Sequence, residues 1–151
     1  MAWWYSLLLT IHILSAITAV GSNLTYGVWA ARGTIESQHL AFVLRGIKFI
    51  DDRIANPAYG LLLATGVTMW LTTWPLGTRW IISGLILYAL VAVLAITMIS
   101  PALNKEIAAV ETQGPTSPEA LAYASRVRGV GIFVSVVVLA IVFVMVFKPA
   151  F

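Results

Sequence analysis

Residues 129–147 read GVGIFVSVVVLAIVFVMVF, an apolar run without a charged residue. A helix rises about 1.5 Å per residue, so a run of this length can cross roughly 30 Å of hydrocarbon. Three more apolar runs precede it, at about residues 4–31, 54–74 and 78–100. The four runs together make up most of the chain. We therefore expect residues 1–151 to form a single membrane domain, an all-α integral membrane four-helix bundle.

The composition of the chain also indicates a membrane protein. Hydrophobic residues make up 60% of the sequence and charged residues only 10%, whereas soluble domains devote about a quarter of their residues to charge. The net charge of +3 comes from side chains near the expected helix ends. We attribute it to orientation in the membrane, and expect a lipid bilayer and no nucleic acid as partner. The sequence contains no cysteine, which excludes disulfides, thiolate metal sites and iron–sulfur clusters.

The segments between the apolar runs carry most of the charged residues. Residues 34–53 mix charged side chains with bulky apolar ones, a pattern typical of an amphipathic helix at the membrane interface. Residues 75–77 predict a tight turn, and Pro101 is expected to bend or end the third span. Residues 114–118 read GPTSP and predict a loop. Ser117 can then cap a helix that leads into the fourth span.

The basic residues are distributed unevenly between the two sides of the expected bundle. Seven of the nine lie between spans one and two or between spans three and four: Arg32, Arg45, Lys48, Arg53, Lys105, Arg126 and Arg128. The positive-inside rule therefore predicts a multi-pass protein of the plasma (inner) membrane, with both termini outside and both long loops in the cytoplasm. Aromatic side chains gather on the side of the termini, as a belt at the outer interface would: Trp3, Trp4, Tyr5, Trp74 and Trp80.

His12 is the strongest candidate for a functional residue in this sequence, because it is an ionisable side chain inside an expected span. It lies eight residues past Trp4, which is about 12 Å deep at 1.5 Å per residue. Small and polar residues share its helix face: Ala16, Ala19, Asn23, Tyr26 and Ala30. Apolar residues point away from that face: Leu14, Ile17, Leu24 and Val28. We expect the His12 face to look into the bundle.

Residues of the second and third spans extend this picture. Tyr88 lies eight residues past Trp80, so it is expected at the depth of His12, within reach of the imidazole or of a ligand between them. Gly84 and Tyr88 lie near one face of the third span. A row of small residues on the second span is expected to allow close helix packing: Gly60, Ala64 and Thr68.

An imidazole in a dry bundle is a usual axial ligand of b-type haem, which needs no covalent thioether link. Met69 and Met145 approach the outer ends of their helices and are candidates for a sixth ligand. His39 is excluded as a second ligand within one protomer, because 27 helical residues separate it from His12 by about 40 Å. The alternative is a structural role, in which His12 joins helices by a hydrogen bond to Tyr88, Ser135 or a backbone carbonyl.

Four groups of residues occur in an order that resembles a known group of families. These are LTIHI at residues 9–13, NPA and TGV at 56–58 and 65–67, Trp80, and VFKP at 146–149. The order is similar to bacterial membrane proteins that include the four-span, haem-dependent protoporphyrinogen oxidase and the copper-resistance D-like proteins. It most resembles the uncharacterised four-span predicted membrane proteins grouped near them.

The resemblance implies haem binding at His12. It also implies an essential lysine four residues after Trp80, where this sequence has Gly84. The side chain that protoporphyrinogen oxidation would need is therefore missing.

The leading interpretation is a haem b-binding integral membrane protein that acts in electron transfer, redox sensing or haem handling. His12 would be the iron ligand, and Tyr88, Met69 and Gly84 would belong to the cofactor site. Oxidoreductase activity, a redox partner and a homo-oligomer are all compatible with this interpretation. Two alternatives stay open: a cofactor-free accessory or structural subunit, and a copper or small-solute carrier.

Overall fold

The computed structural model describes residues 3–149, which form four long helical rods. The first and last rods are single helices, α1 (Trp3–Ile35) and α6 (Pro118–Phe147). The second rod comprises η1 (Ser37–His39), α2 (Leu40–Ile50), η2 (Asp51–Ala55) and α3 (Asn56–Thr73). The third comprises α4 (Arg79–Leu94), η3 (Ala95–Ile99) and α5 (Ser100–Gln113). All four rods are long and apolar enough to cross a membrane, so the all-α bundle with four candidate spans is confirmed.

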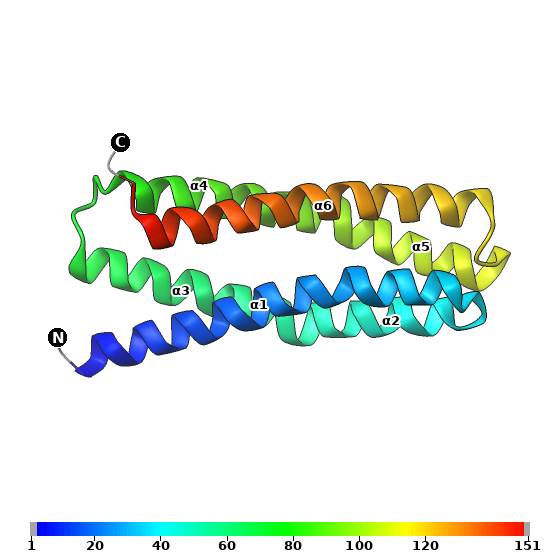
Figure 1. The fold of residues 1–151 in the computed structure, drawn as a ribbon, viewed down its shortest axis with the longest axis horizontal. Coiled ribbons are helices and arrows are strands. Elements are labelled where there is room, and N and C mark those ends of the chain that lie inside the picture. The colour runs from blue at the N-terminus through cyan, green and yellow to red at the C-terminus, as the bar shows by residue number, and fades with distance from the viewer. Residues whose placement is uncertain (1–2, 150–151) are drawn as a thin grey trace.

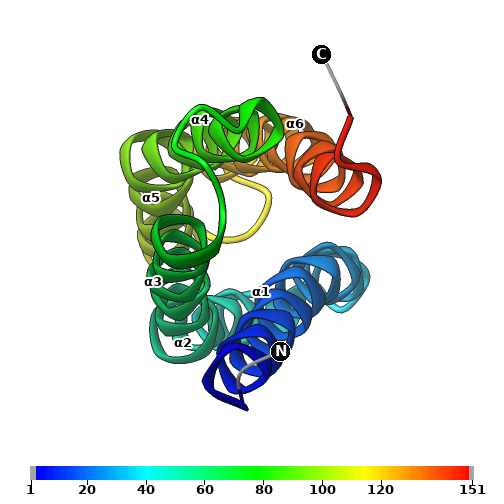
Figure 2. The same ribbon diagram turned by 90° about the vertical axis from the view of Figure 1, so that its left-hand side faces the viewer.

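The rods run side by side as two antiparallel pairs (Figure 1). In one pair α1 packs against α2 and α3, and in the other α6 packs against α4 and α5. Contacts between α2 and α5 join the pairs. Both termini and the turn between α3 and α4 lie at one end of the bundle, which we call the terminal end; the other end is the loop end (Figure 1). Viewed from the terminal end, the helices form an open arc with α1 and α6 at its two ends (Figure 2), and α1 and α6 also contact each other.

The outer surface of α1 is apolar and its inner face is small and polar. Ala19 is completely buried and Ser15 nearly so, whereas Leu14, Ile17, Leu24 and Val28 are all more than half exposed. A surface of exposed leucine, isoleucine and valine is stable in hydrocarbon and not in water. The predicted inward and outward faces of the first span are therefore confirmed.

The rods are longer than a bilayer requires, and the excess lies at the loop end. A span takes about 20 residues, whereas the second and third rods have 37 and 35 residues. Counting about 20 residues from the terminal end reaches Arg53, Ser100 and Arg128 on the second, third and fourth rods. Seven of the nine basic residues lie at this level or beyond it towards the loop end. We therefore expect the terminal part of the bundle, slightly more than half of the second and third rods, to cross the membrane and the loop-end part to project towards water.

The loop end has an apolar core of its own, to which α2 contributes one face. Leu40, Leu44 and Ile47 of α2 are buried with Leu103 and Val110 of α5. On the opposite, exposed face of α2, Arg45 pairs with Glu111 of α5 at 2.6 Å and lies between the exposed rings of Phe42 and Phe49. The amphipathic helix predicted between spans one and two is therefore present. The structure differs in its placement, because α2 continues α3 along the bundle axis and packs Leu40, Leu44 and Ile47 against α1 and α5. Phe42 and Phe49 remain exposed.

One buried acid borders this core. Glu106 of α5 is only 6% exposed. Burial raises the pKa of Glu106 to about 7, and the charge of Arg128 opposes that rise. The carboxyl group therefore titrates near neutral pH.

Two short π-helical turns interrupt the second and third rods, and each ends two residues before a proline. The first, Asp51–Ala55, precedes Pro57, and the second, Ala95–Ile99, precedes Pro101. Proline lacks an N–H and its ring crowds the carbonyl four residues earlier. A wider π turn relieves that crowding, so the helix continues through the proline. Pro101 therefore does not end the third rod, which runs on to Gln113.

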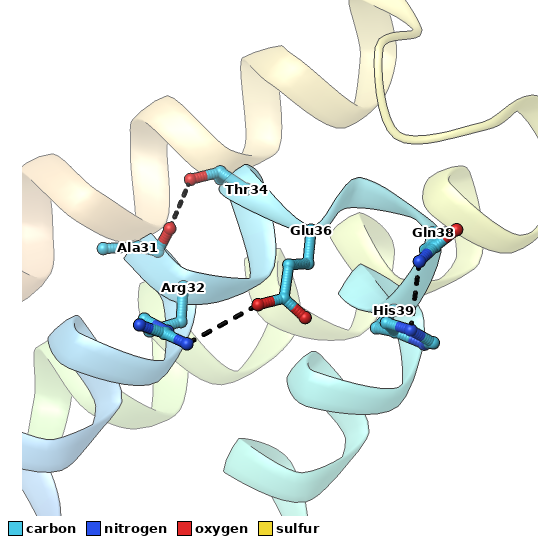
Figure 3. Close-up of polar contacts among 6 residues, drawn as sticks. All are labelled: Ala31, Arg32, Thr34, Glu36, Gln38 and His39. Atoms are coloured by element: carbon cyan, nitrogen blue, oxygen red, sulfur yellow. Dashed lines mark hydrogen bonds and ion pairs between the residues drawn. The ribbon is translucent and has the colours of Figure 1, made fainter.

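The connections between rods follow local sequence rules. Trp74 to Thr78 form the tight turn expected from residues 75–77. Gly114 has a φ of 94°, in the region that favours glycine, and ends α5. The Ser117 hydroxyl accepts a hydrogen bond from the Ala120 N–H at 3.3 Å and caps α6 as predicted. Figure 3 shows the link between α1 and α2, where Arg32 pairs with Glu36 at 3.5 Å.

The small-residue row predicted to pack on the second rod is wrong. Gly60, Ala64 and Thr68 are exposed, and a side chain added at Gly60 would meet no atom within 4 Å. The buried face of α3 holds Ala58, Thr65 and Met69 instead. Both rows contain small residues. The row with Thr65 is the buried one, because the Thr65 hydroxyl has a polar partner on α1, which is described in the next subsection.

Candidate functional site around His12

The imidazole of His12 is held by α3. Its Nδ1 lies 2.9 Å from the Thr65 hydroxyl oxygen, across the interface between α1 and α3. Thr65 is 7% exposed and His12 is partly buried. The two residues lie at matching depth, because Thr65 precedes Trp74 by nine residues and His12 follows Trp4 by eight. The contact therefore fixes the register of two antiparallel helices.

The hydrogen-bond pattern favours one imidazole tautomer. The Thr65 hydroxyl donates to the carbonyl of Leu61 at 2.6 Å, one helical turn earlier. When the hydroxyl proton points to this carbonyl, the hydroxyl oxygen accepts and the His12 Nδ1–H donates. Among the hydrogen bonds of residues 3–149, none involves His12 Nε2. This nitrogen therefore keeps a lone pair, the atom with which a neutral histidine binds a metal.

Gly66 makes room for the imidazole ring. A Cβ atom at Gly66 would lie 2.9 Å from His12 Cε1 and 3.5 Å from Nδ1. Real Cβ atoms do not approach another carbon so closely, so any side chain at this position would push the ring away. Thr65 and Gly66 thus act together, one orienting the imidazole and the other admitting it.

Tyr88 lies elsewhere in the polar network. Its hydroxyl donates to the backbone carbonyl of Tyr59 at 3.0 Å, and the two rings meet edge to face with centroids 6.4 Å apart. The Tyr59 hydroxyl in turn accepts from the Asn23 amide of α1. Tyr88 therefore joins α4 to α3. The side-chain hydrogen bond of His12 goes to Thr65 and not to Tyr88 or Ser135, two of the partners that the sequence suggested. The third suggestion, a backbone carbonyl, is met by Leu62 of α3, which also lies within hydrogen-bonding reach of the ring.

The two methionines and Gly84 occupy packed positions. Met69 is 8% exposed and lies one turn beyond Thr65 on the buried face of α3. Met145 of α6 packs against Gly84 of α4, and a Cβ at Gly84 would overlap its terminal methyl group. Gly84 is buried, as expected for a glycine on a packed face. Its lack of a side chain allows α4 and α6 to approach each other.

His39 lies at the loop end, far along the bundle from His12. It ends η1, and its Nε2 is 3.3 Å from the Gln38 side-chain nitrogen in an exposed position (Figure 3). In the part of the chain that the structure describes, no three His, Cys, Asp or Glu side chains gather into a metal site. The site at His12 is thus a single imidazole with an oriented free nitrogen.

Comparison with protein families places this arrangement in a known group. The model of the family described as "Predicted integral membrane protein (DUF2269)" matches residues 6–149. The chain belongs to this family. The match covers nearly the whole chain and extends over all four rods. Neither a comparison with curated proteins nor one with solved structures gives a match.

Thr65 and Gly66 are the site residues that reasoning from single positions missed. Both are common in membrane helices and neither is ionisable, so neither attracted a functional interpretation. The signal that identifies them is depth, since counting inward from the tryptophans of both helices brings Thr65 level with His12. They also lie within TGV, one of the motifs that carried the family resemblance.

Proposed function

We propose that this DUF2269 protein binds haem b through His12 Nε2 and acts in electron transfer, redox sensing or haem handling. The observation that carries the proposal is the Nδ1–H hydrogen bond to Thr65, which leaves Nε2 as the free donor atom. Histidines that bind metals almost always donate their other N–H to a fixed acceptor, which sets the tautomer and raises the basicity of the ligand.

Two features of the chain support a b-type cofactor at His12. The donor is a neutral imidazole inside a span, the usual ligand of haem iron. With no cysteine in the chain, attachment would be non-covalent. Haem bound here would supply a reversible one-electron couple. The protein's part is to hold the imidazole, through Thr65, and to keep water from it, through the buried face of α1 and α3.

The resemblance to the haem-dependent protoporphyrinogen oxidase group supports haem at His12 and argues against that group's reaction. The lysine that the resemblance requires is replaced by Gly84, and Met145 fills the neighbouring space. We therefore assign no substrate oxidation to the site. A redox partner in the membrane, or transfer of haem itself, is compatible with a single-imidazole site.

A cofactor-free accessory subunit is the competing proposal, and one observation favours it. The hydrogen bond between His12 and Thr65 already joins α1 to α3, so the imidazole has a structural use without a metal. The two proposals differ in whether Nε2 has a ligand in the cell.

An absorption spectrum of protein purified from cells grown with ample haem separates them. We expect a Soret band with b-type bands on reduction, and haem that acid acetone extracts. His12→Ala should lose the haem while the helices still insert, and His39→Ala should keep the spectrum. A colourless wild-type protein would end the haem proposal, and a coloured His12→Ala protein would assign the ligand to another residue.

We also propose that the protein sits in the bacterial inner membrane with both termini outside and the loop end in the cytoplasm. The seven-to-two asymmetry of Lys and Arg supports this orientation. Single cysteines at Gly77 and Gly114 test it with an impermeant thiol reagent on intact cells. Gly77→Cys should react and Gly114→Cys should not; the reverse pattern would invert the topology.

A further inference from the structure

A small basic pocket lies between α5 and α6, away from His12. Its volume is about 170 Å³, well above the roughly 10–15 Å³ that one water molecule needs. Lys105 and Arg126 line it from the two helices, together with the Tyr123 ring and Thr97. The Lys105 ammonium lies 5.7 Å from the centre of the Tyr123 ring, which holds the cation at the pocket.

The positive charge of this pocket is not neutralised by the protein. Its lining includes no carboxylate. The ion pairs among residues 3–149 use other basic residues, namely Arg32, Arg45 and Lys48. The nearby buried acid, Glu106, interacts with Arg128. Lys105 and Arg126 therefore converge on a space that favours an anion.

The level of the pocket along the bundle identifies the kind of anion. Thr97 and Met98 belong to the last turns of the third span, which ends at about Ser100, whereas Lys105 and Arg126 lie on the projecting side. The pocket thus straddles the membrane surface, with apolar Met98 towards hydrocarbon and two cations towards water. A phospholipid has this polarity, and basic pockets between helices at this level bind lipid head groups.

We propose that the pocket binds the phosphate of an anionic phospholipid. Lys105 and Arg126 neutralise the phosphate and the Tyr123 ring lines the same space, while the acyl chains leave past Met98 into the bilayer. A zwitterionic lipid carries its own cation next to the phosphate, so it competes poorly for two protein cations. This site is independent of haem at His12.

Native mass spectrometry of the delipidated full-length protein tests the proposal, with phosphatidylglycerol and phosphatidylcholine of identical chains as probes. The wild type should bind phosphatidylglycerol with clear preference. Lys105→Gln/Arg126→Gln should weaken that binding about thirtyfold, since each basic residue near the surface contributes a factor of about five. The matched control is Arg32→Gln/Arg45→Gln, which removes the same charge from the same end and should change binding little.

Three results would overturn the proposal: equal binding of the two lipids, equal losses in the two double variants, or displacement of phosphatidylglycerol by inorganic phosphate. The first two mean that no specific site exists, and the third means that a free anion is the ligand. The charge-conserving exchange Lys105→Arg/Arg126→Lys should retain the preference. Its retention would show that loss in the glutamine variant reflects charge and not misfolding.

Discussion

Removing the Thr65 hydroxyl tests the site most directly, because the hydroxyl stands between the helix scaffold and the imidazole. Thr65→Val keeps the shape of the side chain and deletes the acceptor of the His12 Nδ1–H bond. Interhelical hydrogen bonds in membranes contribute about 0.6 kcal/mol on average and up to about 1.7 kcal/mol. Thr65 is buried, so we expect a loss of about 1 kcal/mol in the free energy of unfolding in detergent.

The same substitution should act more strongly on haem binding than on stability. Loss of an outer-shell partner typically lowers metal affinity by a factor of about 10–100. Haem affinity is measured by titrating haem into the apo-protein and following the Soret absorbance, while circular dichroism during thermal unfolding reports stability. Thr65→Ser is the matched control, since it keeps the hydroxyl and should retain both properties. Lower stability with unchanged haem affinity would refute the claim that Thr65 orients an iron ligand, and unchanged stability would refute the hydrogen bond itself.

Three further substitutions follow from the packing. Gly66→Ala should displace the His12 ring and lower haem affinity at least tenfold with the helices intact, because the new Cβ would lie 2.9 Å from Cε1; an unaltered Soret titration would contradict this. Gly84→Lys should lower the free energy of unfolding by about 1–3 kcal/mol, from overpacking against Met145 alone. Adding Met145→Ala should restore part of this loss. Wild-type yield and stability in the single variant would place Gly84 against open space. Glu106→Gln tests the raised pKa of about 7. A folded-state pKa above the unfolded value means that the acid's stabilising contribution is present below about pH 4.5 and is lost as the pH rises through 7. The variant should therefore match the wild type near pH 4 and exceed it at pH 8, by about 1–3 kcal/mol from the size of the shift. Parallel pH profiles would show that Glu106 is hydrated.

The fold was predictable from sequence where single residues carry strong physical signals. Long uncharged runs indicate spans, the positions of Leu14 and Ala19 separate the two faces of α1, and Ser117 marks a helix start. The placement of α2 was not predictable in the same way. An apolar face can be covered by lipid or by another helix, and only the partner surface on α5 decides between them.

The site was predictable in part, for a related reason. His12 stands out because burying an ionisable group in a membrane is costly, so its position alone carries information. The position of its partner, Thr65, carries little information, since threonine is common in spans and usually bonds to its own helix. Thr68 does this with Ala64, and Thr65 does it as well while also accepting from His12. Choosing between them requires the relative rotation of α1 and α3, which arises from the packing of the whole interface.

The two π turns divide the second and third rods into segments that can evolve separately. A π turn amounts to one residue inserted into a helix, and each residue of an α-helix advances the side chains by about 100°. Deletion of one residue within Asp51–Ala55 would therefore rotate α2 by about 100° relative to α3, and Leu44 would leave the loop-end core while Thr65 kept its place beside His12. An insertion or deletion at this level changes which residues face the loop-end core without disturbing the membrane part. Within the DUF2269 family, length differences should therefore concentrate at these two turns. Each such difference should rotate the pattern of buried residues at the loop end relative to the pattern of lipid-facing residues in the membrane part.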